Sequence, residues 1–198
     1  MAAFSRQAWA RVKGGGRRTR ALAEMRQFSG VENVTGSNFN DYLYWFDNAG
    51  ANVANGGGGD DTLAGGTGAD LLRGGAGRDM ARYADAGAWI AASLADSSAN
   101  AGDAAGDSYQ DIEDLGGGAY DDRLSGDDQA NVLAGLAGRD SLFGGAGNDT
   151  LSGGDGADRI DGGTGFDTAS YADAAAGVIV NLTNPAQGTG AAAGDVFL

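Results

Sequence analysis

Apolar side chains recur at nine-residue intervals along two stretches of the chain, residues 36–82 and 117–170. Each unit reads G-G-x-G-x-D-x-U-x, where U is the apolar position, and Trp45 and Phe46 interrupt the frame once. This spacing fits neither an amphipathic helix nor an alternating strand, and a fixed short period indicates a repeat architecture. We therefore interpret the apolar positions as the core of a solenoid. They are Leu43, Leu63, Leu72, Leu124, Leu133, Leu142, Leu151 and Ile160, with Ala54, Ala81 and Ala169 as smaller members.

The polar positions of the unit predict its local structure. Glycine adopts positive φ at little steric cost, so the first four positions favour a tight turn. The sixth-position aspartate directs a carboxylate into that turn, and the last three residues form a short strand with one side chain inward. Two turns and two strands close a coil of about 18 residues, and successive coils stack about 4.8 Å apart. Each unit therefore stacks on the unit two places along, so that Asp149 pairs with Asp167 and skips Asp158.

A longer repeat of 88 residues encloses the nonapeptides, because YADAGAWIAASL from Tyr83 returns as YADAAAGVIVNL from Tyr171. Within the second copy, the β-branched stretch Val178–Leu182 favours a strand. We predict a disordered basic leader, irregular or with a short helix, then two repeat blocks that each precede a β-rich spacer. These segments are residues 1–30, 31–82, 83–116, 117–170 and 171–198. The last spacer is shorter than the first, so we expect the chain to be a piece of a longer protein.

Composition and charge exclude several classes of protein. The chain has no cysteine and no histidine among its 198 residues, which rules out disulfides, Ser-His-Asp triads and histidine-based zinc sites. The net charge is -14, although residues before Val31 carry seven basic side chains against one acid. No continuous apolar run suits a secretory signal or a transmembrane segment. The negative field of the repeats disfavours nucleic-acid binding.

The regularly spaced acids point to metal binding rather than to catalysis. Carboxylates stacked at the spacing of one coil repel each other unless a cation lies between them. Carboxylates and turn carbonyls are hard oxygen ligands, which suit Ca²⁺ better than the tighter octahedron of Mg²⁺. Acids that recur at every ninth residue single out no unique pair for acid–base or glycosidase chemistry. We therefore predict that this region is not an enzyme.

The tandem units GGAGNDTLS, GGDGADRID and GGTGFDTAS from Gly144 resemble the RTX (repeats-in-toxin) family, also called haemolysin-type calcium-binding repeats. The resemblance covers about residues 31–198. It implies an all-β fold, a parallel β-roll or β-helix-like solenoid, with calcium held between turns by sixth-position aspartates and turn carbonyls. It also implies secretion by a one-step, type I bacterial export system.

Carried onto this sequence, the resemblance implies a set of calcium ligands. The side-chain ligands would be Asp41, Asn52, Asp61, Asp70, Asp79, Asp122, Asn131, Asp140, Asp149, Asp158 and Asp167. The turn glycines would be Gly57, Gly59, Gly66, Gly68, Gly75, Gly77, Gly138, Gly145, Gly147, Gly154, Gly156, Gly163 and Gly165. Both asparagines keep an oxygen but lose the charge, so we expect weaker sites there, and Phe39, Ala49 and Tyr120 break the glycine pattern. We expect roughly five to seven calcium ions, which together offset the entropy of ordering so much glycine.

The expected function is calcium-dependent folding. The acidic region should be unfolded at low calcium and fold at extracellular calcium, as a structural and secretion module of a secreted bacterial protein. One alternative is the calcium-stiffened stalk of a surface adhesin, with an extracellular surface or a polysaccharide as partner. Another is the non-catalytic repeat domain of a secreted hydrolase whose catalytic residues lie outside this chain.

Overall fold

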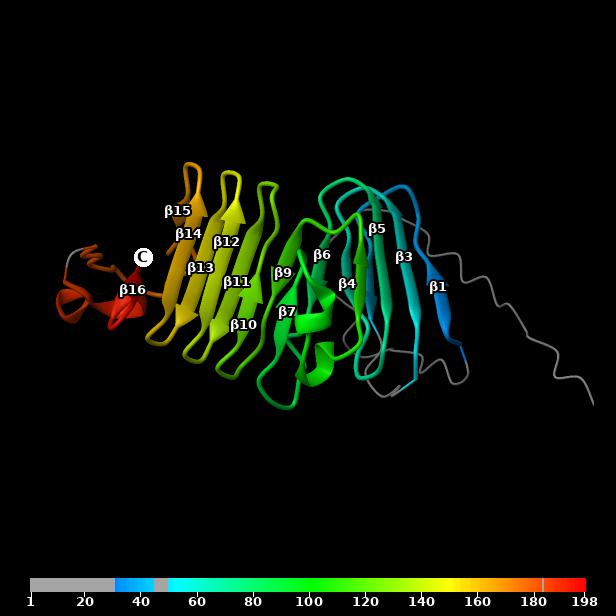
Figure 1. Cartoon of the computed structure of the whole chain (residues 1–198), viewed down its shortest axis with the longest axis horizontal. Coiled ribbons are helices and arrows are strands. Elements are labelled where there is room, and N and C mark those ends of the chain that lie inside the picture. Colours follow the sequence, from blue (N-terminus) through cyan, green and yellow to red (C-terminus); the bar gives the residue numbers. More distant parts are fainter. Residues whose placement is uncertain (1–30, 45–49, 183) are drawn as a thin grey trace, which may run out of the picture.

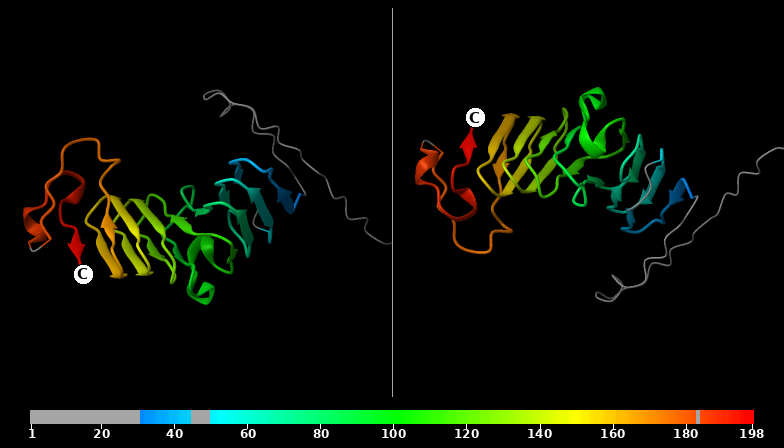
Figure 2. Two further views of the ribbon diagram at one scale, coloured as in Figure 1. Left: turned by 90° about the horizontal axis from the view of Figure 1, so that it is seen from above. Right: turned by 90° about the horizontal axis from the view of Figure 1, so that it is seen from below.

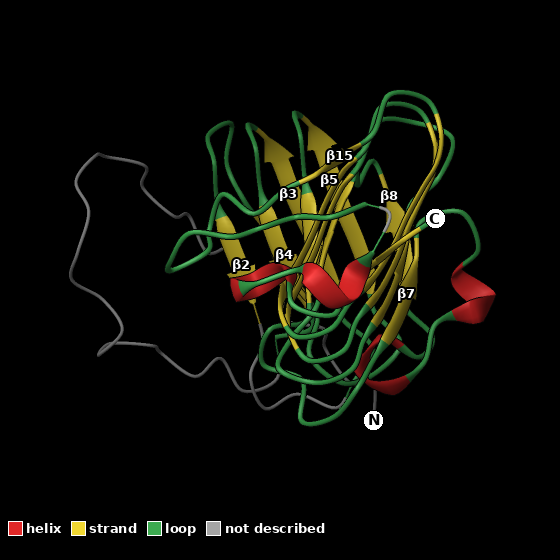
Figure 3. Cartoon of the chain, turned by 90° about the vertical axis from the view of Figure 1, so that its left-hand side faces the viewer, coloured by secondary structure: helices red, strands yellow, loops and turns green. Residues whose placement is uncertain are grey.

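The computed structural model describes residues 31–44, 50–182 and 184–198. These residues form an elongated solenoid that coils between two layers of short parallel strands (Figure 1). Viewed along the long axis, the two layers face each other across a narrow interior (Figure 3). The expected all-β parallel roll is confirmed. The predicted leader, residues 1–30, and the interruption at Trp45 and Phe46 lie outside the described residues.

The two layers differ in continuity. One is a single seven-stranded sheet, and the other is divided into a four-stranded and a five-stranded sheet. The seven-stranded sheet contains, in order, β2 (Tyr42–Tyr44), β4 (Thr62–Ala64), β6 (Met80–Arg82), β9 (Asp114–Gly116), β11 (Val132–Ala137), β13 (Thr150–Asp155) and β15 (Thr168–Ala169). The four-stranded sheet contains β1 (Asn33–Thr35), β3 (Val53–Gly58), β5 (Leu71–Ala76) and β8 (Ser108–Gln110). The five-stranded sheet contains β7 (Ala91–Ser93), β10 (Arg123–Ser125), β12 (Ser141–Ala146), β14 (Arg159–Thr164) and β16 (Val196–Phe197).

The strand register confirms the predicted coil. Leu133 lies opposite Leu151, and Leu142 lies opposite Ile160, so each unit stacks on the unit two places along the chain. The predicted apolar positions form the core, and seven leucines are fully buried inside the roll. These are Leu63, Leu72, Leu115, Leu124, Leu133, Leu142 and Leu151. One apolar side chain per strand makes a thin core, which limits the hydrophobic stabilisation of the fold.

Several strands are longer than the three residues expected. Six of them span six residues, because they continue through the opening glycines of the next unit. Gly57 pairs with Gly75, and Gly145 pairs with Gly163, across neighbouring coils. A Cβ added to Gly145 would clash with the Asp127 carbonyl oxygen of the preceding coil. The absence of side chains therefore lets strand pairing extend into the turn.

The first spacer joins the two blocks by a detour of the chain. From β6 it crosses to β7 at the start of the five-stranded sheet, then returns through two 3-10 helices, η1 (Ser97–Ala99) and η2 (Gly102–Ala104). It then forms β8 at the end of the four-stranded sheet and re-enters the continuous sheet as β9. No pairing joins β7 to β8, so this layer opens at the joint, where the strands of the two blocks differ in direction (Figure 2).

The 88-residue repeat is also a structural repeat. Helices η3 (Pro185–Gln187) and η4 (Gly190–Ala192) repeat η1 and η2, and the bridge between Ile179 and Thr189 repeats that between Ala91 and Ala101. The strand expected at Val178–Leu182 is wrong in extent, since only this isolated bridge forms there. Its counterpart β7 is a strand because it pairs with β10. Among the described residues, nothing takes the place of β10 beside Ile179.

One residue of the second block predicts a stabilising substitution. Leu136 occupies the second position of its unit with a φ of 81°, a conformation that favours glycine. Such strain costs about 1–3 kcal/mol, and the side chain is 43% exposed, so little burial is lost by removing it. We expect Leu136→Gly to raise the free energy of unfolding by about 1 kcal/mol in calcium, measured by thermal or denaturant unfolding.

The matched control is Gly145→Ala, at the same position of the neighbouring unit, which should destabilise the protein because its φ is 108° and its Cβ meets backbone. Destabilisation by Leu136→Gly would contradict the assignment of strain at this position.

Candidate metal centre

Two columns of acidic side chains follow the turns on the two sides of the solenoid. Each member is the residue directly before a strand, so the strand register places it beside its counterpart in the next coil. The first column contains Asp41, Asp61, Asp79, Glu113, Asn131, Asp149 and Asp167. The second column contains Asn52, Asp70 and Asp107, and, beyond the joint, Asp122, Asp140, Asp158 and Asp195.

One oxygen of each interior carboxylate supports the coil before it. The backbone N–H of Asp149 donates to Asp167 Oδ1 at 3.0 Å, and the N–H of Asp140 donates to Asp158 Oδ1 at 2.9 Å. The same bond joins all seven pairs of units two places apart, which are Asp41–Asp61, Asn52–Asp70, Asp61–Asp79, Asp122–Asp140, Asn131–Asp149, Asp140–Asp158 and Asp149–Asp167. The predicted pairing of each unit with the unit two along is therefore confirmed, while calcium sharing within the pairs remains a prediction.

The second oxygen of the interior carboxylates is buried and has no hydrogen-bond partner. This holds for the Oδ2 atoms of six aspartates. They are Asp61, Asp70, Asp79, Asp140, Asp149 and Asp158. Burying an ionised oxygen without a partner is costly, so each Oδ2 atom requires either a cation or a proton.

Backbone carbonyls face these orphaned oxygens. A Cβ added to Gly144 would lie within 3.0 Å of both Asp149 Oδ2 and the carbonyl oxygen of Gly162 in the next coil. A Cβ on Gly135 would meet Asp140 Oδ2 and the Gly153 carbonyl oxygen in the same way. The first-position glycine therefore leaves a small space bordered by a carboxylate oxygen and a carbonyl oxygen. These first-position carbonyls were missing from the ligands predicted from the sequence.

The predicted turn glycines adopt the backbone conformation expected of them. All have positive φ. These are Gly57, Gly59, Gly66, Gly68, Gly75, Gly77, Gly138, Gly145, Gly147, Gly154, Gly156, Gly163 and Gly165. Equivalent second-position carbonyls already accept one hydrogen bond, as Gly118 does from the Ala137 N–H at 3.1 Å. The role of these glycines as carbonyl ligands stays a prediction.

Where a column begins, and where the second column is interrupted at the joint, protein donors hold the second carboxylate oxygen. We call these the outer positions. The N–H of Gly118 donates to Asp122 Oδ2 at 2.6 Å, and the N–H of Ser37 donates to Asp41 Oδ2 at 2.5 Å. The hydroxyl of Tyr83 donates to Asp107 Oδ2 at 2.7 Å. These donors give the outer carboxylates partners that the interior ones lack, so the interior coils are the stronger candidates for ions.

The asparagines of the columns are also engaged by the protein. Asn52 Nδ2 donates to the Gly50 carbonyl oxygen at 2.7 Å, and Asn131 Oδ1 accepts the Asp127 N–H at 2.9 Å. Both side chains therefore take part in holding their own turns, and the expectation of weaker sites there stays a prediction.

Three members of the columns were missed by sequence reasoning. Glu113 Oε2 accepts the Asp79 N–H at 2.9 Å, Asp107 Oδ1 accepts the Asp70 N–H at 2.8 Å, and Asp195 Oδ1 accepts the Asp158 N–H at 2.9 Å. Asp107 and Asp195 lie 88 residues apart, and each is the last residue of a tetrapeptide A-A-G-D. This recurrence was the sequence signal that could have identified both of them. Tyr171 repeats the contact of Tyr83 by donating to Asp195.

Burial changes the proton affinity of the interior acids. Desolvation raises the pKa of Asp140 to about 7 and that of Asp158 to about 6, while hydrogen bonds from the backbone partly oppose the shift. Desolvation also raises the pKa values of Asp61, Asp70, Asp79 and Asp149. These six aspartates therefore bind protons more tightly than free aspartates do when no cation is bound.

The donor set fits a hard divalent cation. Among the described residues, no group of three or more acidic side chains gathers at one point. Each space instead offers carboxylate oxygens of the column together with backbone carbonyl oxygens, the ligand types that Ca²⁺ prefers. The six orphaned oxygens lie beside these spaces and lack a protein partner, so they are available as ligands.

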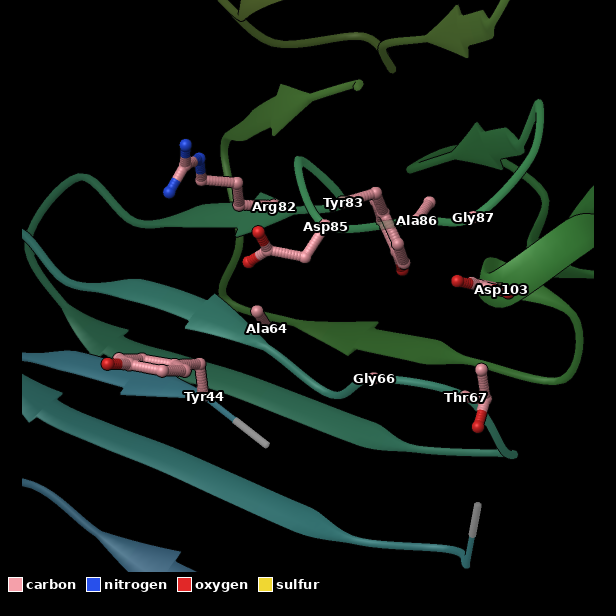
Figure 4. Close-up of a pocket in the computed structure, with 10 residues that line it drawn as sticks. All are labelled: Tyr44, Ala64, Gly66, Thr67, Arg82, Tyr83, Asp85, Ala86, Gly87 and Asp103. Atoms are coloured by element: carbon pink, nitrogen blue, oxygen red, sulfur yellow. The ribbon is translucent and has the colours of Figure 1, made fainter. Parts of the chain in front are cut away.

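A hollow of about 320 Å³ lies outside the columns. Tyr44, Arg82 and Asp85 lie at one end of it, and Thr67 and Asp103 at the other (Figure 4). A smaller hollow lined by Tyr171 and Asp173 repeats it 88 residues later. Both form where the first turn of a spacer packs beside the continuous sheet, and neither is lined by a member of the acidic columns.

Comparison with known protein families decides the identity of the repeats. Residues 46–81, 114–142 and 134–169 match the RTX calcium-binding nonapeptide repeat (4 copies). The chain belongs to the RTX calcium-binding repeat family. Its repeats therefore form a calcium-binding module, and RTX repeat regions are themselves non-catalytic structural units. No curated protein matches the chain. No helix in the described residues is long and apolar enough to cross a membrane.

The two columns predict that ligand substitutions act independently. Asp149 and Asp158 are neighbours in sequence but belong to different columns. We expect Asp149→Ala and Asp158→Ala each to lower the calcium stoichiometry measured by isothermal titration calorimetry, and the double variant to lose the sum. The exposed Asp155→Ala serves as control and should bind the full number of ions. A double variant that loses no more than either single variant would contradict the two-column arrangement.

The raised pKa values predict how stability depends on pH. A folded-state pKa above the unfolded value stabilises the fold below the ordinary aspartate pKa, and this contribution is lost as pH rises through the folded value. For Asp140 that value is about 7. Calcium-free protein should therefore be more stable at about pH 4 than at about pH 8, whereas saturating calcium should reverse the order because protons displace the ion.

Unfolding followed by circular dichroism at both pH values tests this, with Asp140→Asn expected to flatten the calcium-free profile and Asp155→Asn to leave it unchanged. Calcium-free protein that gains stability toward pH 8 would contradict the assignment.

Proposed function

We propose that this chain is a calcium-triggered folding module of a secreted, extracellular bacterial protein. The observation that carries the proposal is the set of six buried Oδ2 atoms without partners, which makes the fold unfavourable unless a ligand neutralises them. Calcium is scarce in the cytoplasm and abundant outside the cell. The chain would therefore stay unfolded before export and fold after it.

The remaining features of the solenoid agree with such a trigger. The core holds one small or medium apolar side chain per strand, and 38 residues of the chain are glycine. Glycine loses the most conformational freedom on folding, so this core alone is a weak driving force. An ion at ten times its dissociation constant adds about 1.4 kcal/mol to stability. Six interior sites, one for each orphaned oxygen, fit the expected range of ions.

The proposed ligands follow from the columns. The interior carboxylates Asp61, Asp70, Asp79, Asp140, Asp149 and Asp158 would each supply the orphaned oxygen. Carbonyl oxygens of the adjoining turns, such as those of Gly74, Gly153 and Gly162, would complete the coordination. Their partners in the neighbouring coil hold the turns at a fixed spacing, so binding of one ion orders two coils at once.

A second candidate role is a calcium-stiffened stalk. It is favoured by the seven-stranded sheet, which runs without a break through the joint between the two blocks. The 88-residue module repeats both its 3-10 helices and its bridge, so further copies would lengthen the solenoid without changing its architecture. Further copies in the flanking coding sequence would favour the stalk, and a catalytic motif there would favour the repeat domain of a secreted hydrolase.

The proposed trigger predicts a folding transition. In chelator at about pH 8, where the interior aspartates are charged, the chain should give the circular dichroism spectrum of an unfolded protein. Millimolar calcium at the same pH should produce a β-rich spectrum and a cooperative thermal transition. Magnesium at the same concentration should be much less effective, because it retains its water and requires tighter geometry. A β-rich spectrum that chelator leaves unchanged would overturn the proposal.

A further inference from the structure

One turn at the joint between the two blocks is shorter than the turns on either side of it. The strand register aligns Arg73 with Gln110, and the N–H of Asp79 donates to Glu113 Oε2 at 2.9 Å. The turn between Arg73 and Asp79 reads GGAGR, whereas its counterpart before Glu113 reads only DI. The coil that leads into β9 therefore lacks three turn residues, and it has no turn glycine.

The side chain of Arg78 extends across this short turn. Its Nε donates to Asp114 Oδ2 at 2.9 Å, and its Nη2 donates to Asp114 Oδ1 at 2.8 Å. The same Nη2 donates to the carbonyl oxygen of Ala130 at 3.1 Å. Asp114 is the first residue of β9, and Ala130 lies in the turn before β11, the next strand of the continuous sheet. The guanidinium therefore links three successive coils, its own and the two that follow.

The groups that hold Arg78 are of the same kinds as those that border the interior turns, a carboxylate and a backbone carbonyl. The side chain of Asp114 is only 9% exposed, so its charge requires a partner. The hydrogen bonds with Asp114, opposed in part by burial, and then the charges of Asp114, Glu113 and Asp149 raise the pKa of Arg78. Since Glu113 and Asp149 are members of the first column, Arg78 places a permanent positive charge beside that column.

The orphaned oxygens of the first column are interrupted at the same place. Asp79 before the joint and Asp149 after it each have a buried Oδ2 atom without a hydrogen-bond partner. Glu113 and Asn131, which lie between them in the column, have no such atom. The first column therefore lacks an orphaned oxygen in the two coils that the guanidinium of Arg78 contacts.

Arg139 provides an internal comparison, because it occupies the same fifth position of its own unit. Its backbone N–H donates to Asp121 Oδ1 at 2.8 Å, as that of Arg78 donates to Asp60 Oδ1 at 3.1 Å. Its side chain is exposed and forms no hydrogen bond or ion pair with the residues that the structure describes. The turn that stacks on it, GGDGA, is complete. The contacts of Arg78 therefore depend on the short turn and not on the repeat alone.

We propose that Arg78 takes the place of a calcium ion at the joint and neutralises the first column there. The inference rests on the proposed calcium trigger and adds to it a cation that the chain itself supplies. The arginine fork matches a carboxylate in geometry and keeps its charge, so in the folded chain no ion is needed to bridge Asp114 and Ala130. The two blocks therefore stack at this point of the column through a side chain, whereas the coils within each block stack through calcium.

Urea unfolding in buffered calcium, followed by circular dichroism, tests this role. The slope of the free energy of unfolding against the logarithm of free calcium gives the number of ions taken up on folding. Arg78→Ala should raise this number by about one, because an ion then replaces the guanidinium between Asp114 and Ala130. Arg78→Lys should keep the wild-type number because it retains the charge. Arg139→Ala is the matched control and should also keep the wild-type number.

Equal slopes for Arg78→Ala and the wild type overturn the proposal, and so does an equal rise in Arg139→Ala. If Arg78→Ala does not fold at any calcium concentration, Arg78→Lys decides. A wild-type slope in that variant supports the replacement of calcium by a side-chain charge, and a larger slope or a failure to fold overturns it. Failure of the calcium trigger itself is a different result, in which the stability of the wild type does not depend on calcium.

Discussion

The buried carboxylates of the two columns set the conditions under which the solenoid exists. Each interior aspartate uses one oxygen to hold the backbone N–H of the coil before it and leaves the other without a protein partner. The first contact fixes the spacing of the coils, and the second makes that spacing costly unless charge is neutralised. A single side chain thus couples the geometry of the roll to a ligand, which is the physical basis for the proposed dependence of folding on calcium.

Glycine is the counterpart of this constraint in the backbone. The spaces beside the orphaned oxygens exist because first-position residues such as Gly144 have no Cβ. Second-position glycines such as Gly145 and Gly154 lie so close to the preceding coil that a Cβ would clash with a carbonyl oxygen. Leu136 departs from this pattern and still has a positive φ, so it adopts the conformation of the glycines that occupy the same position in the following units.

The spacer converts a uniform roll into a modular one. Because β7 and β8 both enter the same layer without pairing, that layer opens while the opposite sheet runs through. Tyr83 then provides a hydroxyl donor for Asp107, where the second column of the first block ends, and Tyr171 does the same for Asp195. A column can therefore end on a neutral hydroxyl donor. At the joint, the edge strands β6 and β7 then pair with β9 and β10 of the second block.

The nine-residue period determined the coil, the pairing of alternate units and the apolar column from sequence alone. It could do so because the turn and strand of each unit are local, and stacking copies of one unit admits a single register, as Asp149 and Asp167 show. The period could not place Glu113 or Asp107, which lie 34 and 37 residues from their partners and follow no nonapeptide spacing. Nor could it reveal that one oxygen of each aspartate is occupied by backbone and the other is orphaned. Those features depend on the path of the chain through the joint and on contacts between coils, which only the tertiary structure decides.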